Sequence, residues 1–336
     1  MKEILNQLIE HKTLSQDQAK EVLKTIATGG YNSSQIASFM TVYLMRSITV
    51  EELRGFRQAM LELCIPVEIE EYGAMDLCGT GGDGKDTFNI STLASFIVAG
   101  AGQPVAKHGN TGVSSICGSS NLLAHFGYQF TNDIGEIRRS LDEAGLCFLH
   151  APLFHPAMKN VAPIRKDLGV KTFFNMLGPM VNPSFPTKQL VGVFSLELAR
   201  LYGYLYQEME GRFSILHAMD GYDEISLTGP FKMISNSGEK LYHPENLGFS
   251  KLTPESIKGG DTIEESAKIF ENVLRGKGEI AQNQVVIANA AAALVTAREG
   301  LTFADAVLQA EEVLLSGKAL NVFNGLVNPQ TTVSLA

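Results

Sequence analysis

The spacing of apolar residues changes character near residue 74. Up to about residue 63, apolar positions recur every three or four residues behind helix-start signals at Ser15 and Ser33–Ser34, which predicts helices throughout. From Ala74 onward, short apolar runs alternate with helical stretches. Strands are predicted at 75–78, 104–107, 146–151, 189–194 and 213–218, and helices at 91–100, 121–126, 134–144 and 196–209. This alternation predicts an α/β fold, with a mostly parallel central sheet flanked by helices and a small all-helical domain.

The same pattern predicts two domains that interrupt each other along the chain. Residues 154–181 carry two further helical segments, and we expect them to pack onto the small helical domain at 1–65. Residues 74–153 and 182–330 then form the large α/β domain. Within it, antiparallel strands are predicted across 225–242, and three helices follow at 262–275, 282–299 and 302–315.

Composition narrows the class of protein. The chain has 336 residues, 45% of them apolar, and a formal net charge of -9. These values suit a large buried core and disfavour general binding to nucleic acid or to an anionic membrane. The N-terminus has the pattern of a charged amphipathic helix rather than of a signal peptide. Cys64, Cys78, Cys117 and Cys147 lack the spacing of a zinc site or a disulfide framework, so we expect reduced thiols and a cytoplasmic protein.

One stretch of this acidic chain contains no acidic residue. Between Asp86 and Asp133 there is neither Asp nor Glu, and this window follows the glycine-rich loop 79–84 and contains Lys107. Glycine turns supply backbone N–H groups, and the serine and threonine hydroxyls of the window add further donors. These groups bind phosphate, so the sequence predicts an anion site here.

The glycine loop fits two common nucleotide motifs only in part. The Gly79-x-Gly81-x-x-Gly84 spacing matches a dinucleotide fingerprint, but no carboxylate follows where the ribose hydroxyls need one. The Gly79-x-x-x-x-Gly84-Lys85 spacing is close to a nucleoside triphosphate loop, yet Asp86 stands where a hydroxyl should meet magnesium. A tight turn that binds no ligand is the third alternative.

Four ordered motifs carry a more specific resemblance. They are GTGGDGKDTFNIST from Gly79, KHGN from Lys107, HPAM from His155 with Arg165 and TFFNMLGP after it, and GYDE from Gly221. The chain resembles the anthranilate phosphoribosyltransferases over nearly its full length and, more loosely, the pyrimidine nucleoside phosphorylases. The resemblance implies transfer of the phosphoribosyl group from phosphoribosyl pyrophosphate (PRPP) to the amine of anthranilate, with release of pyrophosphate, in tryptophan biosynthesis.

The resemblance also implies three sets of site residues. PRPP would contact Gly79, Gly82, Asp83, Thr87, Asn89, Ile90, Ser91, Thr92, Lys107, Ser115 and Ser119. Anthranilate would contact Gly79, Asn110, His155, Arg165 and Gly178. Magnesium (Mg2+), expected as two ions, would be bound by Ser91, Asp223 and Glu224. No residue is expected to act as a strong general base, because an arylamine is already neutral and nucleophilic at neutral pH.

The chemistry of several residues agrees with these roles, but each residue has a plainer explanation. Asp223 and Glu224 follow a strand at the edge where α/β sheets bind ligands, and their oxygens suit magnesium, although a solvated acidic turn is the alternative. Lys107 either meets phosphate or lies exposed at a strand end. Arg165 either forks onto the anthranilate carboxylate or stays on the surface, and His155 either lines the site or packs in the interior.

Two other functions compete with this interpretation. A pyrimidine nucleoside phosphorylase shares much of the glycine loop but has no need of Asp223 and Glu224 for magnesium. A catalytically silent relative that binds nucleic acid is disfavoured by the net charge of -9. As partners we therefore expect the two small-molecule substrates, with neither nucleic acid nor a membrane.

We also expect a homodimer through the helical domain. The family pairs in this way, and a unit of this size cannot bury all of its apolar residues alone. The residues concerned are Ile4, Leu5, Leu8, Ile9, Val22, Leu23 and Ile26.

Overall fold

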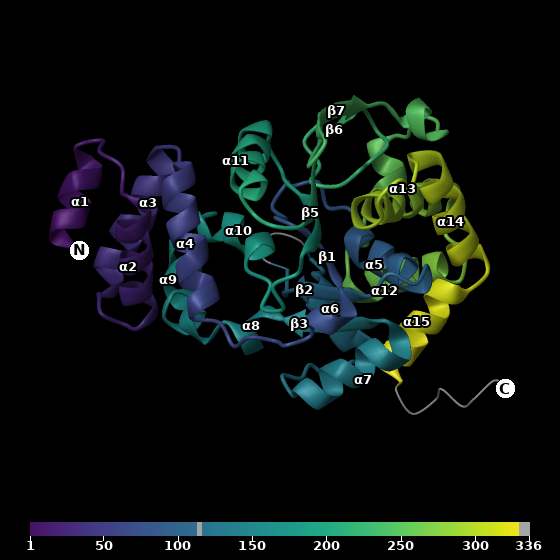
Figure 1. Cartoon of the computed structure of the whole chain (residues 1–336), viewed down its shortest axis with the longest axis horizontal. Helices are drawn as coiled ribbons and strands as arrows, with labels where there is room; N and C mark the ends of the chain where they lie inside the picture. Colours follow the sequence, from purple (N-terminus) through teal and green to yellow (C-terminus); the bar gives the residue numbers. More distant parts are fainter. Residues whose placement is uncertain (113–115, 329–336) are drawn as a thin grey trace. The chain divides into compact units, whose positions relative to one another are not determined.

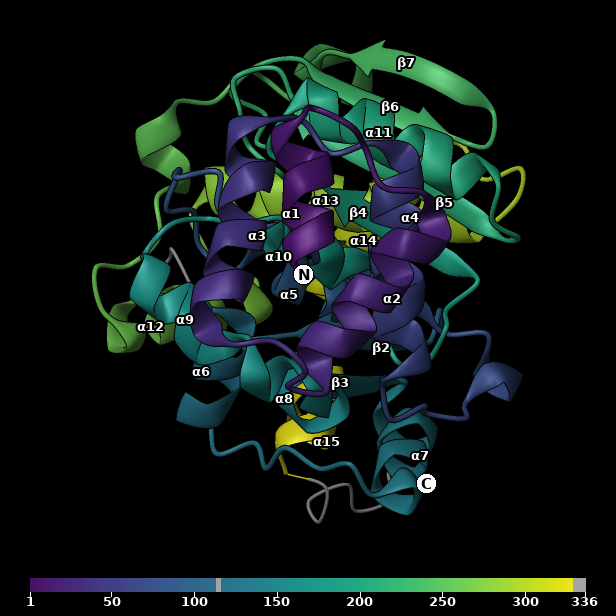
Figure 2. The same cartoon turned by 90° about the vertical axis from the view of Figure 1, so that its left-hand side faces the viewer.

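The computed structural model describes residues 1–112 and 116–328, and the chain divides into two compact units. Unit 1 contains residues 1–66 and 151–185. Unit 2 contains residues 67–150 and the chain from residue 186 onward. Each unit is therefore assembled from two separate segments of the sequence, and Figures 1 and 2 show the course of the chain through them.

Unit 1 is helical, and its early helices begin at well-formed caps. Ser15, Asn32 and Thr49 each accept a hydrogen bond from the third helical N–H, and the Gln or Glu at that position bonds back to the cap. The third helix is thus capped by Asn32, one residue before the predicted signal. The helices are α1 (Lys2–Ile9), α2 (Gln16–Ala27), α3 (Ser33–Met45), α4 (Val50–Glu62), α8 (Ala151–Phe154), α9 (Ala162–Leu168) and α10 (Phe174–Leu177).

An aromatic cluster joins the two segments of unit 1. Phe173, which lies just before α10, stacks on Phe56 of α4 with 4.6 Å between ring centroids, and it meets Phe39 of α3 edge-on at 6.0 Å. All three side chains are buried. Aromatic pairs at these separations add stabilisation beyond the area they bury, so the segment 151–185 is part of the unit 1 core.

Unit 2 is built on a seven-stranded sheet with the order β3-β2-β1-β4-β5-β6-β7. The five strands β3, β2, β1, β4 and β5 are parallel, and the hairpin β6–β7 adds an antiparallel edge. From β1 the chain continues to β2 and β3 toward one edge of the sheet, and from β4 it continues to β5 toward the other edge. The topological switch point therefore lies between β1 and β4. The strands are β1 (Met75–Gly79), β2 (Val105–Gly109), β3 (Leu146–His150), β4 (Lys188–Gly192), β5 (Arg212–Ala218), β6 (Phe231–Ser235) and β7 (Gly238–Tyr242).

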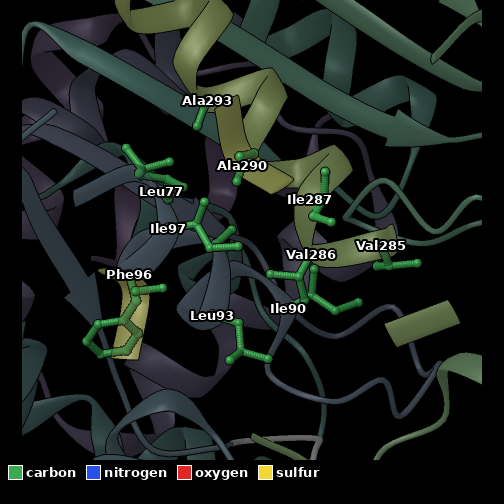
Figure 3. Packing of buried hydrophobic residues seen from close by; sticks show 14 of the residues in the cluster. Leu77, Ile90, Leu93, Phe96, Ile97, Val285, Val286, Ile287, Ala290 and Ala293 are labelled. Atoms are coloured by element: carbon green, nitrogen blue, oxygen red, sulfur yellow. The ribbon is translucent and has the colours of Figure 1, made fainter. Parts of the chain in front are cut away.

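Helices cover both faces of this sheet. α5 and α13 pack against each other and against the parallel strands on one face, and α11 packs on β5 and β6 from the other (Figure 1). Figure 3 shows the buried contact between α5, α13 and Leu77 of β1. The helices of unit 2 are α5 (Ile90–Gly100), α6 (Ser119–His125), α7 (Ile134–Ala144), α11 (Leu196–Gln207), α12 (Ile263–Leu274), α13 (Ile280–Ala297), α14 (Phe303–Leu315) and α15 (Lys318–Val327).

Helix α13 is both long and apolar. Among the described residues, it is the one helix whose length and apolar character would allow it to cross a membrane. Most of the helix is buried inside the unit, and the small side chains of Ala288 and of the alanines at 290–293 let α5 approach closely. Its apolar composition therefore reflects a place in the core of unit 2.

The structure confirms the predicted fold class, with a mostly parallel sheet, flanking helices and a helical N-terminal unit. Two local predictions were wrong. The stretch 225–230 is irregular rather than a strand, because Leu227 has a φ of 57° and Pro230 immediately precedes β6. Helix α15 was not predicted at all.

Candidate functional site

The candidate site lies where the sheet changes direction. Gly79 ends β1 and Gly192 ends β4, and these two residues are paired in register across the switch point. Ligands of open α/β sheets bind outside the carboxyl ends of the strands at such a point. The segment that follows β5 brings Asp223 to the same place, because the Asp223 carboxylate lies against Gly79 and its backbone lies against Gly192.

Asp223 and Glu224 are held by the loops on either side of the switch point. The Asp223 carboxylate accepts a hydrogen bond from the Gly81 N–H at 2.7 Å, and Glu224 accepts one from the Ser91 N–H at 2.9 Å. The glycine loop and the first turn of α5 thus both donate to this pair. The solvated acidic turn is excluded, since the Asp223 side chain is buried.

A buried asparagine fixes the same segment from behind. Asn289 of α13 accepts from the N–H of Ile225 at 3.0 Å and donates to its carbonyl at 2.8 Å. This pair of hydrogen bonds to one residue's backbone sets the segment directly after Glu224. A side chain on the core helix therefore positions the two carboxylates.

The electrostatics of the carboxylates favour a cation beside them. Burial raises the pKa of Asp223, and the charge of Asp83 raises it further. Burial likewise raises the pKa of Glu224, followed by the charges of Asp223 and Asp83. The Asp223 and Glu224 carboxylates repel each other, and the charge of Asp83 adds to this repulsion, so a divalent ion beside the pair would relieve it.

Lys107 lies beneath this site rather than at an exposed strand end. The side chain is buried, and its ammonium donates to the carbonyl of Leu77 at 2.6 Å and to the hydroxyl of Ser91 at 3.4 Å. Burial lowers the pKa of Lys107, while the negative charges of Asp76 and Glu224 act in the opposite direction. A cation is therefore placed directly behind Ser91.

A small cavity separates these groups. Its volume is about 20 Å³, and its lining includes Gly79, Ser91, Gly192, Asp223 and Glu224. A space of this size holds about one water-sized sphere. Within residues 1–112 and 116–328, no group of three or more His, Cys, Asp or Glu side chains forms a metal centre. Ser91, Asp223 and Glu224 offer oxygen atoms at this cavity, so a hard ion bound here would have to take its other oxygen ligands from substrate or water.

The glycine loop has the backbone that only glycine adopts easily. Gly81 and Gly82 have φ angles of 61° and 74°, in the left-handed region, and Asp83 accepts from the N–H of Lys85 at 3.1 Å. Helix α5 follows, with Asn89 at its cap position and Ile90 as its first residue. The loop therefore leads through the short segment 85–89 to a helix N-terminus.

The remaining PRPP candidates of unit 2 lie along this path or on α6. Thr87 forms a bridge with Lys258, Asn89 donates to the carbonyl of Cys117 at 3.0 Å, and Thr92 is buried in α5. Ser119 is the first residue of α6, and its hydroxyl donates to the carbonyl of Asn110 at 3.4 Å. Ser115 lies outside the described residues.

The anthranilate candidates fall on both units. Gly79 and Asn110 belong to unit 2, whereas His155, Arg165 and Gly178 belong to unit 1. Within unit 1, the Arg165 guanidinium donates to the side chain of Asn175 at 3.2 Å and lies 5.5 Å from the centroid of the Phe174 ring. These contacts restrict the guanidinium to one place, as a fixed carboxylate partner requires.

His155 is buried in unit 1, only 4% exposed. Burial lowers its pKa to about 4, so the imidazole is neutral at neutral pH. Gly178 begins the 3₁₀ turn Gly178–Met180, and the Cβ of a larger residue there would meet no described atom within 4 Å. Space therefore remains open in front of Gly178.

Comparison with known proteins identifies the family. The chain is 61% identical to the anthranilate phosphoribosyltransferase of Flavobacterium psychrophilum and 59% identical to that of Christiangramia forsetii, and each match covers 97% of this chain and 98% of the relative. The chain belongs to the anthranilate phosphoribosyltransferase family. Two family models agree with this assignment: the glycosyl transferase family helical bundle domain matches residues 2–64, and the glycosyl transferase family a/b domain matches residues 71–320.

Solved structures of anthranilate phosphoribosyltransferases share the fold. The Thermus thermophilus enzyme is 32% identical with a TM-score of 0.89, and the match covers 96% of this chain and 98% of that one. The Saccharomyces cerevisiae enzyme in complex with PRPP and Mg is 25% identical, also with a TM-score of 0.89, and covers 98% of this chain and 97% of that one.

For this anthranilate phosphoribosyltransferase family member, sequence reasoning missed the residues that position the site. Gly192 and Asn289 contact Asp223 and Ile225 from other strands and helices, and no motif marks either of them. For Asn289, the signal was an asparagine in the middle of an apolar helix, because a buried amide needs a hydrogen-bond partner.

Proposed function

We propose that this protein transfers the phosphoribosyl group of PRPP to the amine of anthranilate, at a site formed by the loops around Ser91, Asp223 and Glu224. The identity of 59–61% to named anthranilate phosphoribosyltransferases over 97% of the chain supports the reaction. The observation that carries the site is the pair of carboxylates bonded to the Gly81 and Ser91 N–H groups at the switch point. The product feeds tryptophan biosynthesis.

The reaction is a substitution at the anomeric carbon of the ribose. The nitrogen lone pair of anthranilate forms the new C–N bond, the C–O bond to pyrophosphate breaks, and the nitrogen releases a proton. Negative charge develops on the leaving pyrophosphate, so the protein must stabilise that charge and hold the two reactants in line. In this proposal, the glycine loop and the first turn of α5 lie beside the phosphates, while their Gly81 and Ser91 N–H groups hold the two carboxylates.

The residues fit magnesium, and we propose two ions as in the sequence-based expectation. Asp223, Glu224 and the Ser91 hydroxyl would hold them together with phosphate oxygens of PRPP. Bound magnesium neutralises pyrophosphate and makes it a better leaving group. Lys107, buried behind Ser91, orients the hydroxyl and supplies a positive charge on the inner side of the site.

For the acceptor, we propose that Arg165 binds the anthranilate carboxylate and that Asn110, His155, Gly79 and Gly178 surround the ring. A neutral His155 suits this role, because it adds polarity without a charge that would repel or attract the amine. Since the arylamine is already nucleophilic, orientation rather than proton removal is what the protein contributes. We also propose that PRPP contacts the remaining candidates from the sequence, which are Gly82, Asp83, Thr87, Asn89, Ile90, Thr92, Ser115 and Ser119.

The test is a double variant that removes charge and preserves shape. Asp223→Asn with Glu224→Gln keeps carbonyl oxygens that can accept from Gly81 and Ser91, which alanine would not. Turnover should fall by roughly 10²-fold or more, because the metal loses both anionic ligands. The wild-type protein should also lose turnover in chelator.

A charge-matched control uses two carboxylates of the same unit away from the switch point. Glu70→Gln with Glu71→Gln removes the same charge from an exposed turn. Its turnover should remain that of the wild type. If the Asp223 and Glu224 variant turned over as fast as this control at limiting magnesium, the metal assignment would be wrong.

We further propose a homodimer and a cytoplasmic location, with no nucleic-acid partner. Leu8, Val22, Leu23 and Ile26 of the helical segment are buried within unit 1, so they are not available for pairing. Exposed apolar side chains nevertheless remain on α1 and α3: Ile9 is 66% exposed and Met45 is 84% exposed. All four cysteines are free, which suits a reducing compartment.

A further inference from the structure

A serine and a histidine outside the proposed substrate contacts touch each other behind the KHGN segment. The Ser120 hydroxyl lies 2.9 Å from Nδ1 of His150. Ser120 is the second residue of α6 and is 1% exposed, and His150 is the last residue of β3. The contact therefore joins the first turn of a helix to the end of a strand.

The His150 ring is fixed by its surroundings. Phe130 stacks on it with 4.5 Å between ring centroids and 25° between planes. Burial lowers the pKa of His150, so the ring is neutral at neutral pH. A neutral imidazole has one N–H and one bare nitrogen, and a hydroxyl both donates and accepts, so either tautomer can form this hydrogen bond.

Helix α6 in turn holds the backbone that follows β2. The N–H of Ser120 donates to the carbonyl of Asn110 at 3.2 Å, and the hydroxyl of Ser119 donates to the same carbonyl. In the same turn of the helix, the Asn121 side chain accepts from the N–H of Gly112 at 2.9 Å. The position of α6 therefore sets the course of the chain from Asn110 to Gly112.

The helix also packs tightly on the end of the strand. A Cβ built on Gly109 would lie 2.6 Å from the Ser119 hydroxyl oxygen, so no free space separates them. Close-packed elements transmit displacements instead of absorbing them. A shift of α6 would consequently move both Ser119 and Asn110.

We propose that Ser120 and His150 are positioning residues for substrate binding: their contact fixes α6 against β3 and thereby holds Ser119 where PRPP needs it and Asn110 where anthranilate needs it. The inference rests on the proposed roles of Ser119 and Asn110 at the substrates. In this proposal neither Ser120 nor His150 contacts the reacting atoms. The pair acts through geometry alone.

Three single variants separate the polar contact from the packing. Ser120→Ala removes the hydroxyl. His150→Phe keeps a ring to stack on Phe130 but cannot form the hydrogen bond. His150→Asn loses the ring but brings an amide oxygen and nitrogen to the place of Nδ1, so it can bond Ser120 in either direction.

Steady-state kinetics should distinguish the variants. Ser120→Ala and His150→Phe should raise the KM for PRPP about three- to tenfold, the factor that one buried neutral hydrogen bond is worth, and the KM for anthranilate should rise as well because Asn110 moves with Ser119; kcat should change little. His150→Asn should restore most of the wild-type KM. The double variant Ser120→Ala/His150→Phe should be no worse than either single variant, since both remove one shared contact.

Two controls make the result decisive. Ser140→Ala removes a serine hydroxyl on α7 that bonds only within its own helix, and its KM should remain that of the wild type. Thermal unfolding of every variant shows whether the fold is retained. The proposal is overturned if the KM for PRPP is unchanged in both Ser120→Ala and His150→Phe, if Asn rescues no better than Phe, or if the two losses add in the double variant. The Asp223 and Glu224 variants test the placement of the site itself, so failure of the site and failure of the pair give different results.

Discussion

Replacing Gly192 by alanine tests whether the position of the Asp223–Glu224 segment controls turnover. A Cβ built on Gly192 would overlap the carbonyl oxygen of Asp223 and lie 2.7 Å from its carbonyl carbon. Nonbonded carbon atoms stay about 3.5–4.0 Å apart, so the Asp223 backbone must retreat by about 1 Å or more. Strand β4 cannot yield instead, because it is paired along its length with β1 and β5.

The displacement moves the carboxylates away from the Gly81 and Ser91 N–H groups that hold them. A misplacement of about 1 Å in a site of this kind costs roughly 10²-fold, and we expect that loss in kcat/KM. The cost in folding stability should be of the same order, about 1–3 kcal/mol for an overpacked methyl group. The assay is fluorescence-monitored consumption of anthranilate at several magnesium concentrations, with thermal unfolding measured on the same samples.

Gly203→Ala is the matched control. Gly203 lies within α11 of the same unit, and its added Cβ would meet only the Ile234 side chain at 3.5 Å, an ordinary contact. Alanine inside a helix should stabilise by about 0.5–1 kcal/mol. If Gly192→Ala had the same kcat/KM as Gly203→Ala while remaining folded, the Asp223 backbone would not set the rate and the reasoning would be refuted.

Three further predictions concern unit 1. Arg165→Ala should weaken the binding of anthranilate by roughly 2–5 kcal/mol, the cost of losing a buried charge pair, and leave the binding of PRPP nearly unchanged, while Arg165→Lys should recover only part of the loss. Calorimetric titration of each substrate measures this, and equal weakening for both substrates would contradict it. His155 has a pKa of about 4 in the folded protein, against an ordinary value of 6.5. Between these two pH values the unfolded chain binds a proton that the folded protein does not, so the free energy of unfolding should rise with pH across this range. The difference between the two pKa values corresponds to about 3 kcal/mol of folding stability. In His155→Gln, urea unfolding at a series of pH values should no longer show this contribution. Met45→Glu should shift a dimer toward monomer in light scattering, since it places a charge on a side chain that is 84% exposed in the single chain, and an unchanged mass would remove α3 from the interface.

The sequence predicted the fold well where the hydrophobic periodicity of a segment and its length indicate the same kind of element. The five parallel strands and the helices between them come from strong local patterns, and each observed boundary lies within a few residues of the predicted one. Helix α15 was missed because its start at Gly317 has no side-chain cap and its sequence contains Gly325. Burial of Ala319 and Phe323 against unit 2 explains why this weak local pattern still forms a helix.

The candidate site was predictable only as far as its motifs extend. Ser91, Asp223 and Glu224 could be proposed because short motifs contain them. Asn289 could not, since its partner Ile225 is 64 residues away and lies in the irregular segment before β6. The contact of Ser120 with His150 also depends on tertiary packing, because neither residue belongs to a recognisable pattern of its own.

The hairpin β6–β7 has a consequence for the behaviour of the protein at high concentration. An open edge strand offers unpaired N–H and C=O groups to other chains and invites aggregation. Here the outermost strand, β7, is only five residues long and carries Glu239 and Lys240, of which Glu239 forms an ion pair with Lys232 of β6. At the opposite edge, α7 and α15 pack against β3. A strand added beside β7 would have to pair next to these charged side chains, so this edge of the sheet is protected against growing into intermolecular assemblies.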